Sequence, residues 1–177
     1  MNNIYFDNAA TTPLRNEVID CMTEVMRISF GNASSTHSYG RSSKALIEKS
    51  RKTIASFLNC SASEIVFTSG GTEADNLVLR SAVKDLNVTR IISSKIEHHA
   101  VLHTIEALAD EFNITVDYVS LDKNGSVDMS HLDELLKSST SKTIVSLMHI
   151  NNEIGNKLDL KSVAELCKTF NALFHTD

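Results

Sequence analysis

Four short polar motifs in this sequence contain residue types that could bind a ligand or move a proton. Each motif directly follows an apolar, strand-like run. They are Ser69-Gly70-Gly71-Thr72, Glu97-His98-His99, Asn151-Asn152-Glu153 and His175-Thr176-Asp177. Ligands of parallel α/β sheets bind beyond the carboxyl ends of the strands. The spacing therefore predicts one shared site, provided that the apolar runs belong to a single sheet.

The Gly70-Gly71 pair followed by Thr72 is typical of an anion site. A strand-like run ends before the glycines and a helical pattern begins after them. The first amides of a helix have no partner within it and carry the positive end of its dipole, so they bind phosphate. The motif is neither a P-loop nor a dinucleotide GxGxxG. The alternative interpretation is a glycine turn with a Thr cap.

A histidine at the carboxyl end of a strand can lie flat over an aromatic ring and can transfer protons near neutral pH. His98 and His99 occupy such a position. The alternative is a capping or core histidine. Adjacent residues on a helix do not share a face, so this pair does not predict a metal site, and we expect no metal.

The remaining two motifs supply an amide and a carboxylate. The Asn151-Asn152 amides can donate to a phenolate oxygen, although an ordinary polar loop would contain the same residues. Asp177 could keep a pyridine nitrogen protonated, which allows the ring to accept electrons from a substrate carbanion. The alternative is an aspartate that merely ends a strand.

Helical and strand-like patterns alternate along most of the chain. We expect strands at 65–68, 90–93, 114–119, 143–148 and 172–176, and helices at 16–27, 38–58, 72–84, 99–112, 129–136 and 160–170. The continuous apolar run at 143–148 is typical of a strand that is buried on both faces. This order predicts an α/β fold with a mostly parallel sheet and covering helices.

The composition and charge of the chain bear on its partners and its location. The 177 residues are 42% hydrophobic and 22% charged, with a net charge of −5, so we expect no nucleic-acid partner. No apolar run approaches the roughly 20 residues of a membrane span, so we expect no membrane partner. Three scattered cysteines fit a reducing compartment. The first residues lack the basic start and apolar stretch of a signal peptide, so a cytoplasmic location is expected.

Taken together, the motifs resemble those of a known family. The sequence is similar to the cysteine desulfurase branch of the class V aminotransferases, which are pyridoxal-phosphate enzymes of fold type I. The similarity runs along the whole chain with family-like spacing. The matching stretches are IYFDNAATTPL (4–14), GNASSTHSYGR (31–41), FTSGGTEADNL (67–77), IEHHAVL (96–102), MHINNEIG (148–155) and FHTD (174–177).

The resemblance implies a role for each matching residue. Gly71 and Thr72 would hold the phosphate of pyridoxal 5'-phosphate, and His98 would stack on its ring and assist proton transfer. Asn152 would contact the phenolic oxygen, and Asp177 the ring nitrogen. The substrate pocket would include Asn8, Ala9, Ala10, Asn32 and His37.

Two positions depart from the family pattern. Ala33 stands where the family usually has proline, and Asn156-Lys157 stands where it usually continues toward Gln-Pro.

The resemblance also implies an organisation and an activity. Residues 1–14 would belong to the small domain, and residues 15–177 would form the first part of the cofactor-binding large domain of a fold type I transferase. The parent protein would be a transferase that converts L-cysteine to L-alanine and passes the sulfur to an enzyme cysteine. This sulfur would serve iron–sulfur cluster assembly or thiolation. A homodimer partner and a sulfur-acceptor or scaffold protein are implied.

Two family residues have no counterpart in the chain. None of its eleven lysines lies in the context of the Schiff-base lysine, and no cysteine matches the persulfide position. We therefore expect a truncated chain that is inactive alone. The alternatives are an inert remnant or binding module, or another class V aminotransferase such as a selenocysteine lyase.

Overall fold

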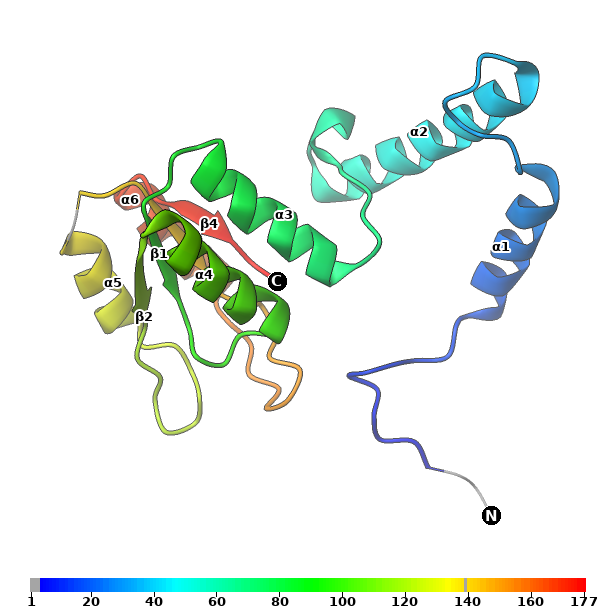
Figure 1. Cartoon of the computed structure of the whole chain (residues 1–177). Coiled ribbons are helices and arrows are strands. Elements are labelled where there is room, and N and C mark those ends of the chain that lie inside the picture. Colours follow the sequence, from blue (N-terminus) through cyan, green and yellow to red (C-terminus); the bar gives the residue numbers. More distant parts are fainter. Residues whose placement is uncertain (1–3, 139) are drawn as a thin grey trace. The chain divides into compact units, whose positions relative to one another are not determined.

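The computed structural model describes residues 4–138 and 140–177, and the chain divides into two compact units. The first unit is Met1–Phe67 and the second is Thr68–Asp177 (Figure 1), and each is described by itself. The predicted assignment of residues 1–14 to a small domain concerns a longer protein and stays a prediction. Its first three residues lie outside the described ones.

The first unit is helical. It contains α1 (Asn16–Ile28), α2 (Ser38–Leu58) and the short 3-10 helix η1 (Ala62–Glu64). The loop before α2 packs tightly on that helix, because a Cβ at Gly40 would lie 2.3 Å from the carbonyl oxygen of Ser35. The predicted strand at 65–68 is wrong, since the segment has no strand assignment. An apolar run becomes a strand only where a neighbouring strand accepts its hydrogen bonds, and the described part of the chain offers this one none.

The second unit is a parallel sheet covered by helices. Its helices and strands alternate in the order α3 (Gly71–Lys84), β1 (Arg90–Ser93), α4 (His99–Phe112), β2 (Thr115–Tyr118), α5 (Met129–Lys137), β3 (Thr143–Ser146), α6 (Leu160–Thr169) and β4 (Leu173–His175). The four strands lie in the order β2-β1-β3-β4, and all three pairings are parallel. The predicted α/β class with a mostly parallel sheet is confirmed.

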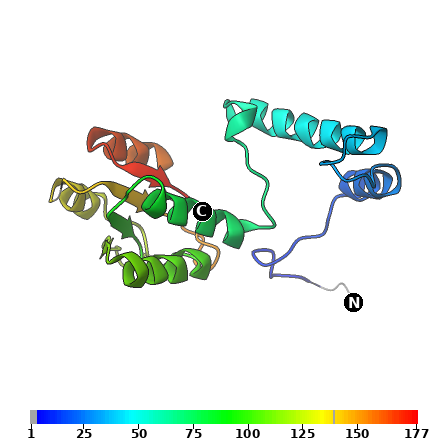
Figure 2. The ribbon, with the colours of Figure 1, turned by 45° about the horizontal axis from the view of Figure 1, so that its top comes forward.

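The strands alternate their side chains between two cores. Ile91 and Ile144 face the first core, which contains Leu79 of α3 and Ile105 of α4. Their neighbours Ile92 and Val145 face the second core, which α5 and α6 complete. The helices α3 and α4 thus cover one face of the sheet, and α5 and α6 the other (Figures 1 and 2). Both central strands, β1 and β3, are buried along their whole length, as predicted for β3.

Asp128 fixes the start of α5. Its Oδ1 accepts hydrogen bonds from the amides of Ser130 (2.9 Å) and His131 (3.1 Å). Asp128→Ala is expected to lower the free energy of unfolding by about 1 kcal/mol, the usual cost of losing an N-cap. Urea denaturation measures this change. Asp110→Ala is the control, because Asp110 is exposed on α4; an equal loss in both variants would contradict the capping role.

None of the helices in residues 4–138 and 140–177 combines the length and the apolar character needed to cross a membrane.

Candidate active site

The carboxyl ends of β1, β3 and β4 meet at one edge of the sheet because the strands are parallel. The polar motifs at 97–99, 151–153 and 175–177 follow these three strands. The amide of His149 donates to the carbonyl of Asp177 at 2.9 Å, so the pairing of β3 and β4 continues beyond β4 itself. The sequence therefore brings three of its four motifs to the same edge.

The remaining motif, Ser69-Gly70-Gly71-Thr72, lies at the start of α3. Its first intrahelical hydrogen bond runs from the amide of Ala74 to the carbonyl of Gly70 at 3.1 Å. No group in the described part of the chain accepts from the amides of Gly71, Thr72 and Glu73. An added Cβ at Gly70 or Gly71 would meet nothing within 4 Å, so the glycines border open space. These free donors at a helix N-terminus can bind an anion.

Thr72 and His98 line the same hollow. It has a volume of about 390 Å³ and lies between α3 and α4. Asn76, Arg80, His99 and His103 contribute to its walls. The hydroxyl of Thr72 and the imidazole of His98 are thus close enough to contact one small ligand.

His98 also caps α4. Its Nδ1 accepts a hydrogen bond from the amide of Ala100 at 3.1 Å. The capping role that the sequence left open is therefore present. It also orients the ring: with Nδ1 as acceptor, the neutral imidazole carries its proton on Nε2. A side chain held in one tautomer can present a defined donor to a ligand.

The two asparagines of the β3–α6 loop differ in their surroundings. Asn151 is buried, donates to the carbonyl of Ile96 at 2.8 Å and accepts from the amides of Glu153 and Ile154. Asn152 is exposed, and its amide makes no hydrogen bond within the described residues. Asn151 therefore shapes the loop. Asn152 is free to contact a ligand, although it does not line the hollow of Thr72 and His98.

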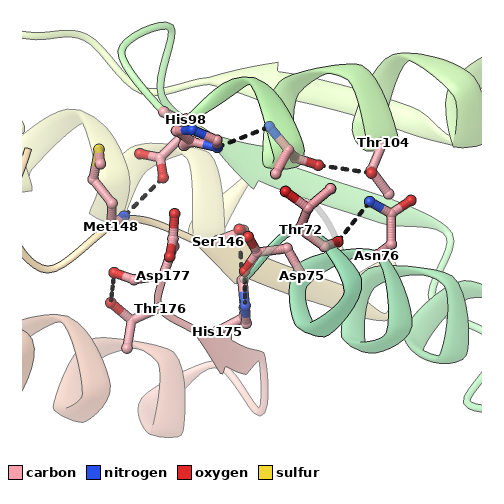
Figure 3. A network of polar contacts seen from close by, with 12 residues as sticks. Thr72, Asp75, Asn76, His98, Thr104, Ser146, Met148, His175, Thr176 and Asp177 are labelled. Carbon is pink, nitrogen blue, oxygen red and sulfur yellow. Dashed lines mark hydrogen bonds and ion pairs between the residues drawn. The ribbon is translucent and has the colours of Figure 1, made fainter. Parts of the chain in front are cut away.

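Asp177 lies near other acidic groups. Burial raises the pKa of Asp75, and the charge of Asp177 raises it further, while His175 and His98 lower it. Figure 3 shows Asp177 in the same group of side chains as Asp75, His175 and His98. A cation placed beside Asp177 would relieve this repulsion, so this end of the site favours a positively charged partner.

Glu97 belongs to the Glu97-His98-His99 motif, but the sequence assigned it no role. It is 6% exposed, accepts from the hydroxyl of Ser94 at 2.6 Å and accepts from the amide of Met148 at 2.8 Å. Burial raises its pKa to about 7, against the lowering effect of these two hydrogen bonds. Glu97 therefore ties the loop that contains His98 to the loop that contains Asn152.

The five predicted pocket residues belong to the first unit. Ala10 lies in a turn closed by its amide on the carbonyl of Asp7, and neighbouring Asn8 and Ala9 are exposed. The Oδ1 of Asn32 accepts from the amide of Ser34, and the Nδ1 of His37 caps α2 by accepting from the amide of Gly40. Their place in a substrate pocket stays a prediction.

Comparison with known proteins decides the family. The family described as Aminotransferase class-V matches residues 4–177. The chain belongs to the class V aminotransferase family. A cysteine desulfurase IscS of Dictyoglomus turgidum (strain DSM 6724 / Z-1310) is 39% identical to this class V chain over 176 residues. That stretch is 98% of this chain and 44% of the relative.

Solved structures agree with this family assignment. A NifS-like protein superimposes on this class V chain with a TM-score of 0.91 and 35% identity, covering 98% of this chain and 48% of that one. SspA in complex with cysteine gives a TM-score of 0.87 and 31% identity, covering 98% and 50%. The chain spans about half the length of the relatives it matches.

Three further polar residues of this class V chain lie close together near Asp177: Asp75, Ser146 and His175. The sequence assigned a role to none of them, although His175 belongs to the last of the four motifs. Two signals could have found them. Asp75 precedes the fully buried Leu79 by four residues and so lies on the inner face of α3. His175 precedes Asp177 by two residues, which in a strand places both side chains on the same face.

Proposed function

We propose that this chain binds pyridoxal 5'-phosphate and is the cofactor-binding part of a cysteine desulfurase. The observation that carries the proposal is the hollow shared by Thr72 and His98, with the free amides of α3 at one side. An anion-binding helix end, a flat imidazole and a carboxylate fit a phosphorylated pyridine. The matching cysteine desulfurase and the solved complex with cysteine support L-cysteine as the substrate class.

Each residue would have a role toward the cofactor that follows from its chemistry. The amides of Gly71 and Thr72 and the Thr72 hydroxyl bind the phosphate, since no other acceptor uses these amides. His98 lies over the ring and holds a proton on Nε2. Asn152 donates to the phenolic oxygen, and Asp177 holds the proton of the ring nitrogen. When bound, the cofactor supplies an electron sink for the α-carbon of an amino acid.

The wider function follows the same relatives. We infer that the whole protein transfers the sulfur of L-cysteine through an enzyme cysteine to an acceptor or scaffold protein for iron–sulfur cluster assembly or thiolation, and acts as a homodimer. The cytoplasm remains the proposed location, because all three cysteines are free thiols, as in reducing compartments. Alanine release from L-cysteine, compared with L-selenocysteine, separates a desulfurase from a selenocysteine lyase.

Cofactor binding can be tested with pyridoxamine 5'-phosphate. This compound has no aldehyde and so cannot react unspecifically with the eleven lysines of the chain. We expect Thr72→Ala to weaken its binding to the full chain about tenfold, as for loss of one hydrogen bond to a charged group. Pyridoxamine, which lacks the phosphate, should bind the variant and the original chain equally. Isothermal titration calorimetry measures both affinities.

Thr169→Ala is the matched control for this test. Thr169 is an exposed helical threonine of α6, whose buried residues belong to the second core, and its hydroxyl donates to the carbonyl of Glu165. Its replacement should leave both affinities unchanged. Equal binding of pyridoxamine with and without the phosphate, or no binding of either, would refute the proposed site.

A further inference from the structure

A buried chain of hydrogen-bonding groups lies directly behind the proposed cofactor site. The Nε2 of His175 lies 3.4 Å from Oδ1 of Asp75, and its Nδ1 lies 2.9 Å from the hydroxyl of Ser146. Asp75 is 4% exposed and Ser146 is fully buried. Figure 3 shows the side chains of Asp75 and Ser146 close to the ring of His175. We call them the Asp75–His175–Ser146 trio.

The partners of the His175 ring determine which of its two nitrogens carries the proton. Burial lowers the pKa of His175, so the ring is neutral at neutral pH. An ionised Asp75 can only accept, which places the ring proton on Nε2. The Nδ1 is then an acceptor, and the hydroxyl of Ser146 donates to it. Every polar atom of the ring therefore has a defined partner.

The trio joins the two ends of the proposed site. Asp75 lies three residues after Thr72 in α3, and His175 lies two residues before Asp177. Other ionisable groups that face the trio are Asp177, from the segment after β4, and His98 and Glu97, from the segment between β1 and α4. Asp75 is a carboxylate of α3, Asp177 is a carboxylate of the segment after β4, and His175 is the last residue of β4. The pair of Asp75 and His175 thus connects β4 to α3.

We propose that Asp75 and His175 are positioning residues for Asp177. They connect β4 to α3, and Asp75 adds a buried negative charge near the exposed carboxylate of Asp177, which would bind a cationic ring nitrogen. The proposal rests on the proposed function, because it concerns the same site. It assigns to Asp75 an effect on ligands with a cationic ring and none on ligands that only carry a phosphate.

Two probes separate these effects on the full chain. Pyridoxamine 5'-phosphate has a ring nitrogen, whereas benzyl phosphate has the same phosphate on a ring without nitrogen. Asp75→Asn keeps the size and the acceptor oxygen but removes the charge. We expect this variant to bind pyridoxamine 5'-phosphate about tenfold more weakly and benzyl phosphate within about twofold of the original chain. Asp110→Asn, an exposed change on α4, should affect neither.

The outcomes distinguish the two proposals. Equal weakening of both probes, or of neither, by Asp75→Asn would overturn the positioning role and leave the proposed function intact. Failure of the original chain to bind either probe would overturn both proposals. A second measurement needs no ligand: nitrogen NMR of the histidine rings should show His175 as the Nε2-protonated tautomer between pH 7 and 8. A His175 ring that titrates freely in this range would overturn the assignment.

Discussion

Replacing Glu97 by glutamine is expected to stabilise the protein at pH 8 by on the order of 3 kcal/mol. Burial raises the pKa of Glu97 from 4.5 to about 7. Between these two values the folded protein keeps the proton while the unfolded chain releases it. The contribution of Glu97 to stability is therefore full below pH 4.5 and is lost as the pH rises through about 7. Glutamine is neutral at every pH, like the protonated acid, so the variant keeps this stabilising contribution at pH 8.

The measurement is the free energy of unfolding between pH 4.5 and 8, for the original chain and for Glu97→Gln. The raised pKa of Asp75 acts in the same direction and the lowered pKa of His175 acts in the opposite one, but both groups remain in the variant. The difference between the two curves therefore reports Glu97 together with its charge interaction with Asp75. Glu153→Gln, an exposed change in the β3–α6 loop, is the control. Parallel curves for the original chain and Glu97→Gln would show that Glu97 does not hold its proton in the fold.

Replacing Arg90 by methionine is expected to lower the free energy of unfolding by roughly 3 kcal/mol, the cost of breaking a buried ion pair. Arg90 is 4% exposed, although it opens a strand. Its Nε lies 2.6 Å from Oδ2 of Asp117, and its Nη1 donates to the carbonyl of Leu135 at 2.7 Å. Removal of the guanidinium takes the ion-pair partner from the half-buried carboxylate of Asp117 and one of two donors from the carbonyl of Leu135, which keeps the hydroxyl of Ser138. Chemical denaturation at pH 7 measures the loss.

Two controls test whether the buried pair is the cause. Lys161→Met removes the cation of an exposed pair with Glu165 at 3.9 Å and should change stability by less than about 0.5 kcal/mol. The double variant Arg90→Met with Asp117→Leu should lose less than the sum of the single variants, because neither charge is then left alone. Additive losses would mean that Arg90 and Asp117 stabilise the fold independently.

The sequence predicted the order of the helices and strands in the second unit, because the apolar residues of each segment recur with a clear helical or strand period. The alternation of helix and strand required parallel pairing, and the apolar run at 143–148 required a central place in the sheet. The run at 65–68 had the same local appearance as a strand and forms none. Strand formation depends on a partner elsewhere in the chain, and a period carries no information about that partner.

The sequence predicted those parts of the candidate site that depend on where a helix begins. Gly71 and Thr72 could be placed at a helix start, and Thr72 shares a hollow with His98. The division of roles between Asn151 and Asn152 depends on which side chain turns inward, which two adjacent amides do not reveal. The sequence assigned no role to Arg90, Glu97 or Asp75, because burial of a charge depends on partners from distant segments.

The strand order has a consequence for synthesis. Because β4 follows β1, β2 and β3 along the chain, Asp177 leaves the ribosome after these three strands. Translation proceeds at roughly 5 to 20 residues per second. Asp177 is therefore synthesised on the order of 5 to 20 s after the first residues of α3. During that interval the nascent chain has an anion-binding end but no acid to hold a cationic ring. We therefore expect cofactor capture to follow release of β4 from the exit tunnel rather than to guide the earlier steps.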